Sequence, residues 1–338
     1  MYLSELTALC GVSGNENPVR NYIKEKVAPY CDRVEIDVMG NLLAYKKARQ
    51  KTDKTLMLCA HMDEVGLIVS RITEEGFLKF KTVGGIDPRV LVSKRVFVGE
   101  EKLPGVIGRK AIHLLSPEER KQAPKVKELY VDMGVKNKKE AEKKVSVGDY
   151  IAFDSRYMPF GDGLLKAKAL DDRAGCSILL ELVAESCDFN LCFAFTVQEE
   201  VGLRGARLCA RRVKPDLCLV LEATTCSDIP ETDVNMVSTR LGGGAALSFL
   251  DGATSYDRDL VASIYRLAQE KSIPVQYKQT ATGGNDAGAI HVSAGGIRTA
   301  SISVPARYIH SPSSVISLSD YEAARELTRT LIQEVSHV

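Results

Sequence analysis

Five sites along this chain place acidic or histidine residues directly after a strand-like apolar run or its turn. They are His61, Asp171, the pair Glu199 and Glu200, Glu222, and His310. Four carboxylates in one cleft would repel one another strongly, and a pair of divalent cations is a common way to stabilise such a cluster. A mixed set of imidazole and carboxylate ligands suits zinc, cobalt or manganese better than calcium or magnesium. The pattern therefore predicts a site for two divalent ions.

The densest part of this pattern is a strand followed at once by two glutamates. Residues 191–197 form an apolar run of strand length, Glu199 and Glu200 come next, and a helix is predicted at 206–212. In an open α/β sheet, ligands bind beyond the carboxyl ends of the strands. Neighbouring residues of an extended segment point in opposite directions, so one glutamate can bind a metal while the other exchanges a proton.

Each position also has a purely structural explanation. His61 could be a hydrogen-bonded core histidine, and Asp171 could cap the helix expected near residue 174. Glu222 could be a surface acid and His310 a loop histidine. Asp63 follows His61 by two residues and can orient the imidazole through its other nitrogen, which favours a ligand role for the histidine. Because all five sites stand at predicted strand ends, chance placement is the weaker explanation.

Alternating strands and helices are expected to position these residues. The main predicted strands are 55–60, 191–197, 217–221 and 300–304, and the main predicted helices are 17–28, 174–184, 257–271 and 319–335. This rhythm is typical of an α/β domain with a largely parallel sheet. Between residues 67 and 166 the pattern changes to short strands broken by glycine and proline, which predicts a small inserted β-barrel or sandwich. We therefore expect an α/β domain of residues 1–66 and 167–338, with a β-rich insertion of residues 67–166.

Composition narrows the function classes. A length of 338 residues favours two domains, and a formal net charge of +1 gives no sign of binding to nucleic acid or to an anionic membrane. The sequence has no apolar run of the roughly 18 residues that a membrane helix needs, and no secretory signal pattern. The nine cysteines are odd in number and lack C-x-x-C spacing. We expect free thiols and a cytoplasmic protein.

Six motifs, in this order, resemble those of the tetrahedral (TET) aminopeptidases. They are AHMDEVG at 60–66, ALDDRAG at 169–175, QEEVGLRG at 198–205, LEATT at 221–225, GGNDAG at 283–288 and YIHSP at 308–312. The family comprises dinuclear-metal exopeptidases, including glutamyl and deblocking aminopeptidases, and some members were formerly labelled endoglucanases. The resemblance spans nearly the whole chain.

The resemblance implies a role for each candidate metal ligand. Asp171 would bridge two divalent ions, with zinc as the first expectation and cobalt or manganese as alternatives. His61 and Glu222 would complete the coordination of one ion, and Glu200 and His310 that of the other. Many relatives have aspartate where this chain has Glu222, and both residues supply a carboxylate.

The resemblance also implies roles for three further acidic residues. Glu199 would be the general base of peptide-bond hydrolysis, and Asp63 would be the partner of His61. Asp286 is a candidate for the lining of the substrate pocket, with capping of the helix that follows as the alternative.

At the level of architecture, the resemblance implies a three-layer α/β/α metallopeptidase domain with a mostly parallel sheet. The insertion would be a PDZ-like β-barrel that serves in dimerisation. Such dimers would assemble into a hollow tetrahedral dodecamer that acts on short peptides.

Three other functions remain open from the sequence. An N-acyl amino acid deacylase could use the same metal pair, a glycosidase also needs two carboxylates, and a non-catalytic scaffold could use the metals for structure alone. Glycosidase carboxylates must flank the scissile bond, which adjacent Glu199 and Glu200 do not suit. The preferred N-terminal residue of a peptide substrate is not evident from the sequence. A preference for acidic residues would need a basic group in the pocket, and four arginines are candidates: Arg89, Arg240, Arg298 and Arg307.

Overall fold

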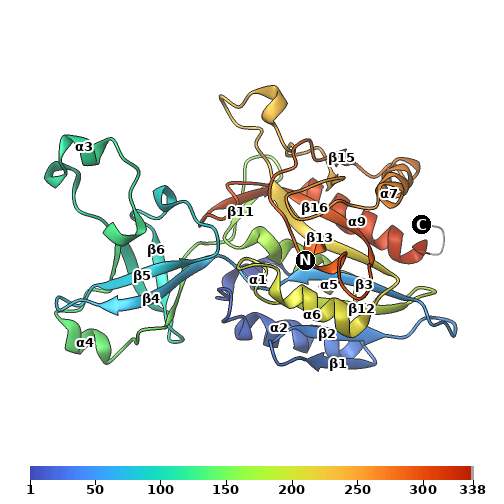
Figure 1. The fold of residues 1–338 in the computed structure, drawn as a ribbon, viewed down its shortest axis with the longest axis horizontal. Helices are drawn as coiled ribbons and strands as arrows, with labels where there is room; N and C mark the ends of the chain where they lie inside the picture. Colours follow the sequence, from blue (N-terminus) through green and yellow to red (C-terminus); the bar gives the residue numbers. More distant parts are fainter. Residues whose placement is uncertain (336–338) are drawn as a thin grey trace.

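The computed structural model describes residues 1–335, which form a helix-covered sheet with a separate barrel beside it (Figure 1). The helices are α1 (Leu3–Ala8), α2 (Asn17–Val27), α3 (Pro117–Arg120), α4 (Lys138–Glu142), α5 (Leu170–Leu182), α6 (Arg204–Val213), α7 (Arg258–Glu270), α8 (Ala287–Ile290) and α9 (Leu318–Gln333). The strands of the large sheet are β1 (Arg33–Ile36), β2 (Leu42–Lys46), β3 (Thr55–His61), β10 (Met158–Phe160), β11 (Leu164–Ala167), β12 (Asn190–Thr196), β13 (Leu217–Thr225), β14 (Ala245–Leu247), β15 (Val275–Tyr277), β16 (Arg298–Arg307) and β17 (Ser314–Ser317). The barrel strands are β4 (Gly66–Ile72), β5 (Leu78–Val83), β6 (Arg95–Val98), β7 (Leu103–Gly108), β8 (Tyr130–Asp132) and β9 (Tyr150–Phe153).

The large sheet has a parallel centre and antiparallel margins. Its main path runs β1-β2-β12-β3-β13-β16-β17-β11-β10, and the four central strands β12, β3, β13 and β16 pair in parallel. Strands β2 and β17 flank this centre and pair with it antiparallel, which makes the whole sheet mixed. The central strands are nearly continuous apolar runs because helices cover both of their faces.

Helices pack on the two faces of the sheet, as the three-layer prediction requires. Helix α5 contacts β3 and β13 and also packs against α1 and α9, whereas α6 packs on β12 and against α8. A single buried core extends through these layers, with Leu58, Phe193 and Leu219 of the central strands in it. The predicted α/β/α class is therefore confirmed.

The inserted unit is a closed antiparallel barrel of strand order β4-β5-β8-β7-β6-β9. It has its own apolar core, to which Leu67, Val96 and Ile151 belong. Closure of the barrel leaves no unpaired sheet edge. The predicted small barrel is confirmed, and Figure 1 shows it beside the α/β body.

The extent of the barrel differs from the division expected from the sequence. Its last strand ends at Phe153, whereas β10 and β11 pair with each other and, through β17, with the large sheet. Residues 154–166, assigned to the insertion by their short strands and turns, thus include strands of the large sheet. Local pattern could not separate them, because a short strand looks the same whichever sheet it joins.

Two further expectations concern the cysteines and the membrane. All nine cysteines are free, and Cys59, Cys176, Cys192 and Cys218 are buried, as their apolar surroundings predicted. Across residues 1–335 no helix combines the length and the apolar character needed to cross a bilayer.

Candidate active site

The candidate residues converge at the carboxyl edge of the central strands. His61 is the last residue of β3, and β12 ends beside it, with Thr196 paired to His61 in parallel register. Glu199 and Glu200 lie in the turn three and four residues after the end of β12, and Glu222 lies towards the end of β13. Because parallel strands end at a common edge, residues far apart in sequence come together here.

Asp171 stands between the two histidines. Its Oδ1 lies 3.1 Å from Nε2 of His61, and its Oδ2 lies 3.3 Å from Nε2 of His310. On the first side, Oε2 of Glu222 is 3.7 Å from Nε2 of His61; on the second, Oε2 of Glu200 is 3.3 Å from Nε2 of His310. The five residues thus form two adjoining groups that share the Asp171 carboxylate.

The neighbouring Asp172 has a different role from Asp171. The peptide bond between the two residues is cis, and both depart from helical dihedral angles at the start of α5. Oδ1 of Asp172 accepts the Gly175 N–H at 2.8 Å, and its Oδ2 accepts the His61 N–H at 3.2 Å. The capping role considered for Asp171 therefore belongs to Asp172, and Asp171 is left facing the histidines.

The donor set of this cluster fits divalent metal ions. His61, Asp171 and Glu200 each offer a ligand atom within 4.8 Å of the others, and so do His61, Asp172 and Glu222. Buried Oε1 of Glu222 has no hydrogen-bond partner among the described residues. A buried carboxylate oxygen without a partner is costly, and a cation at this point would satisfy it.

The pKa values reveal the electrostatic cost of bringing these acids together without metals. Burial raises the pKa of Glu200 to about 8, and the nearby Asp171 carboxylate adds to the effect. Burial also raises the pKa of Glu199, and the charges of Asp286 and Glu200 raise it further. Although burial alone would lower it, Asp171 and Glu200 raise the pKa of His310 to about 9. The cluster therefore has an excess of negative charge that a divalent cation would balance.

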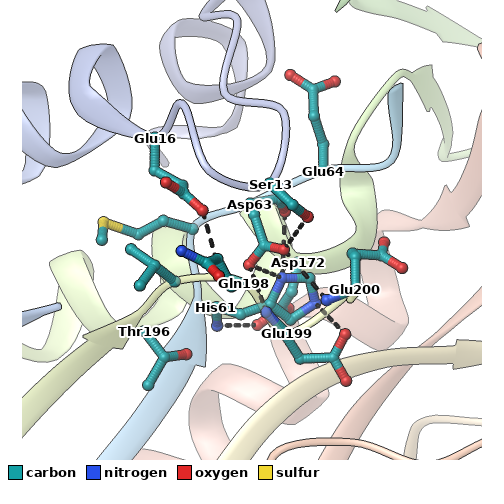
Figure 2. Close-up of polar contacts among 12 residues, drawn as sticks. Ser13, Glu16, His61, Asp63, Glu64, Asp172, Thr196, Gln198, Glu199 and Glu200 are labelled. Carbon is teal, nitrogen blue, oxygen red and sulfur yellow. Dashed lines mark hydrogen bonds and ion pairs between the residues drawn. The ribbon is translucent and has the colours of Figure 1, made fainter. Parts of the chain in front are cut away.

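Asp63 links His61 to the two glutamates. Nδ1 of His61 donates to the main-chain carbonyl of Asp63 at 3.1 Å and lies 3.4 Å from its carboxylate. A carbonyl oxygen can only accept, so Nδ1 carries a proton. Nε2 faces the cluster and lies 3.1 Å from the Asp171 carboxylate, and it is the nitrogen that could bind a metal ion in place of a proton. The Asp63 carboxylate accepts the N–H groups of Glu199 at 3.0 Å and Glu200 at 3.1 Å. Figure 2 shows Asp63 beside the imidazole of His61, with Glu199 and Glu200 nearby.

The family profile of M42 glutamyl aminopeptidases matches residues 40–327 of the chain. The chain belongs to the M42 family. A putative aminopeptidase of Acetivibrio thermocellus is 36% identical to it over 96% of both chains. The predicted likeness to TET aminopeptidases is thereby confirmed, and the family is one of hydrolases that act as exopeptidases.

Solved structures agree with this M42 assignment. An aminopeptidase of the archaeon Desulfurococcus kamchatkensis superimposes with a TM-score of 0.94 at 35% identity, covering 98% of this chain and 93% of its own. The TET1 peptidase of Pyrococcus horikoshii, described as assembling into a tetrahedron or a large octahedral shell, reaches 0.86 at 33% identity over 98% of both chains.

Sequence reasoning missed the contribution of the N-terminal segment of this M42 chain. The hydroxyl of Ser13 donates to the Asp63 carboxylate, and Oε1 of Glu16 accepts the Gln198 N–H at 3.2 Å (Figure 2). The first contact joins residues 50 positions apart and the second joins residues 182 positions apart, so no local sequence motif marks either contact. They fix the loop that carries Glu199.

The expectation for Asp286 does not hold. Its side chain is fully buried, is absent from the pocket lining, and makes no capping hydrogen bond to α8. Instead, Oδ2 of Asp286 accepts the Thr196 hydroxyl at 2.5 Å and lies 3.8 Å from Sγ of Cys59. The preceding residues Gly283, Gly284 and Asn285 line the pocket, whereas the Asp286 side chain turns inward.

Proposed function

We propose that this M42 chain removes the N-terminal residue from short peptides at a site for two divalent metal ions. His61, Asp171 and Glu222 would hold one ion, and Asp171, Glu200 and His310 the other. The sharing of Asp171 between His61 at 3.1 Å and His310 at 3.3 Å is the observation that carries the proposal. Bound ions would polarise the scissile carbonyl and make a water more acidic.

Glu199 is the proposed general base and acid. Its side chain is 11% exposed and lies in the pocket beside the ligand groups, and its Oε2 is 3.9 Å from Nε2 of His61. In this role it accepts the proton of the attacking water and returns it to the leaving amine. Asp63 keeps Glu199 in place through the Glu199 N–H. The remaining carboxylates provide a negatively charged environment for the free α-ammonium group of a peptide.

The test is Glu199→Gln in the metal-loaded protein. We expect turnover of aminoacyl anilides to fall at least about a hundredfold, because removal of a general base costs that much or more. Metal content, measured by mass spectrometry, should stay at that of the wild type. Near-normal turnover by the variant would refute the role of Glu199, and loss of both ions would show Glu199 to be a ligand.

The same assay separates this function from the alternatives. The panel should contain each aminoacyl anilide with a free and an acetylated amine, after chelation and after return of zinc, cobalt or manganese. Metal-restored cleavage of the free-amine set alone is expected. Cleavage of only the acetylated set would indicate a deacylase, and bound metal without cleavage of either set would indicate a scaffold.

We further propose that the chain is cytoplasmic and assembles through barrel-mediated dimers into a tetrahedral dodecamer. The nine free cysteines support a reducing compartment. The likeness to the TET1 peptidase of Pyrococcus horikoshii supports the assembly. Sedimentation of the native protein tests it, and a stable monomer or isolated dimer would contradict it.

A further inference from the structure

Two cavities that differ in charge share His310 and Ile309 in their linings. The smaller cavity, of about 120 Å³, lies at the proposed metal cluster. Its described lining has one lysine, Lys278, against five acidic residues: Asp171, Glu199, Glu200, Glu222 and Asp251. The larger cavity is a cleft of about 720 Å³. Because both cavities reach His310, a peptide bound at the cluster can extend past this histidine into the cleft.

The cleft lies between the barrel and the α/β body. Residues 85–94, in the loop that joins β5 to β6, line its barrel side. Lys166 of β11 and residues of the segment 308–315, which leads from β16 into β17, line its other side. A Cβ atom at Gly85 would lie 3.6 Å from Nδ1 of His310, so the barrel loop closely approaches this proposed metal ligand. The volume of the cleft is within the range of roughly 300–1,000 Å³ that is typical of ligand pockets.

The charged side chains of the cleft give it a net positive charge. Its described lining contains the basic residues Arg89, Lys94 and Lys166 and one carboxylate, that of Asp87. Nε of Arg89 donates to the Asp87 carboxylate at 2.8 Å, so these two opposite charges are paired with each other. Lys94 and Lys166 are therefore the cations that a ligand in the cleft would meet.

The sheet holds Lys166 beside the cleft. Lys166 pairs with Val315 in antiparallel register, which fixes its main chain next to the segment 308–315. Its Nζ donates to the Arg156 carbonyl at 3.1 Å, and an ammonium group has three protons, so two remain for a ligand. Burial lowers the pKa of Lys166, and the charge of Asp154 raises it. A carboxylate in the cleft would stabilise the charged form of this lysine further.

We infer that the cleft binds the C-terminal carboxylate of short peptide substrates through Lys94 and Lys166. The inference rests on the proposed aminopeptidase function and narrows its substrate class to short peptides with a free carboxyl terminus. Such a peptide has a positive amino end and a negative carboxyl end. The acidic cavity and the basic cleft offer the opposite charges in the matching order. Because hydrogen bonds between an ammonium group and a carboxylate are roughly twice as strong as neutral ones, the lysines favour a free acid over an amide.

This arrangement makes the preference depend on the length of the peptide. Each added residue moves the carboxylate of an extended chain by about 3.5 Å. The carboxylate therefore reaches the two lysines only in a narrow range of lengths. In longer peptides it lies beyond the cleft, and its charge no longer matters.

The test uses peptides of about two to eight residues, each as the free acid and as the C-terminal amide. Each begins with the residue that the anilide panel shows to be preferred and continues with glycines, so the terminal carboxylate is the variable charge. At the best short length the metal-loaded wild type should have a kcat/KM about tenfold or more higher for the acid than for the amide. This acid-to-amide ratio should approach one in the longest peptides.

Variants of the lysines identify the source of the preference. In Lys166→Met the ratio should fall by about three- to tenfold, between the effects of an exposed ion pair and of a buried charged hydrogen bond. In Lys94→Met/Lys166→Met it should approach one, and in Lys166→Glu the amide should become the better substrate. Because both substrates are measured on one preparation, a smaller folded fraction cancels from the ratio. Lys144→Met, at an exposed lysine of the barrel insertion outside the cleft lining, should keep the wild-type ratio.

The outcomes separate this inference from the proposed function. A wild-type ratio near one at every length, or a ratio that Lys94→Met/Lys166→Met leaves unchanged, would overturn the inference while leaving the aminopeptidase function intact. A wild type that cleaves no peptide or anilide with a free amine while metal is bound would instead refute the proposed function, and the inference with it.

Discussion

The carboxyl group of Glu200 should make the metal-free protein less stable as the pH rises. Its pKa increases from 4.5 to about 8 on folding, because burial and the Asp171 charge disfavour the ionised form. The folded state therefore binds more protons than the unfolded state between these two values, and the free energy of unfolding falls with pH across that window. Each pKa unit corresponds to about 1.4 kcal/mol, which sets the loss at up to roughly 5 kcal/mol. His310 acts in the same direction: its pKa is raised from 6.5 to about 9, so its stabilisation is present below 6.5 and is lost towards 9.

The perturbation is Glu200→Gln, which removes the titrating group and retains most of its shape. Chelator-treated wild type and variant would be unfolded with urea between pH 5 and pH 8.5, at one fixed protein concentration because assembly affects stability. At pH 8 the metal-free variant should be more stable than the wild type by about 2–5 kcal/mol, and the difference should shrink towards pH 5.

Two controls make this prediction specific. With metal restored the order should invert, because Glu200 is then a proposed ligand whose loss weakens ion binding and the stabilisation that binding supplies. Glu74→Gln, at a carboxylate that is 82% exposed, should leave the pH profile unchanged. Parallel profiles for metal-free wild type and Glu200→Gln would refute the electrostatic reasoning for the whole cluster.

Two further predictions concern Asp63, which positions residues of the site, and Lys168, which pairs with the buried Glu64 carboxylate. Asp63→Asn should weaken metal affinity about ten- to a hundredfold, as measured by competition with a chelator. The amide lacks the charge of Asp63 and is a poorer acceptor for the N–H groups of Glu199 and Glu200. Unchanged affinity would contradict the orienting role of Asp63. Lys168→Met should lower the free energy of unfolding by about 3 kcal/mol, because it leaves the fully buried Glu64 carboxylate without the ammonium group that now lies 2.7 Å away. The matched change at an exposed pair, Lys138→Met, should cost less than about 1 kcal/mol, and equal losses would contradict the reasoning.

Much of the fold could be predicted from local pattern. Apolar runs such as 191–197 correspond to buried central strands, and the helices predicted at 257–271 and 319–335 correspond to α7 and α9. Short strands were harder to assign. Residues 158–166 were predicted to belong to the insertion, yet they pair with the large sheet through β17, and such pairing depends on distant chain segments.

The sequence by itself determined which residues gather at the carboxyl edge of the sheet. Strand ends predict the positions of His61, Glu199, Glu200 and Glu222. The carboxyl ends of parallel strands meet at one edge of the sheet, and this does not depend on the conformation of the loops. Residue type also indicated the kind of chemistry, because two imidazoles and four carboxylates in one cleft are stabilised by divalent cations.

Only the tertiary structure decided what surrounds that cluster. Ser13 and Glu16 reach Asp63 and Gln198 across 50 and 182 residues, and Asp286 turns inward to Thr196 instead of lining the pocket. Lys278 lines the pocket beside Glu199 and Glu200, whereas the candidate arginines Arg89, Arg240, Arg298 and Arg307 do not. These outcomes depend on which loops meet over the sheet and where each side chain finds a partner, and neither is encoded in the spacing of residues along one segment.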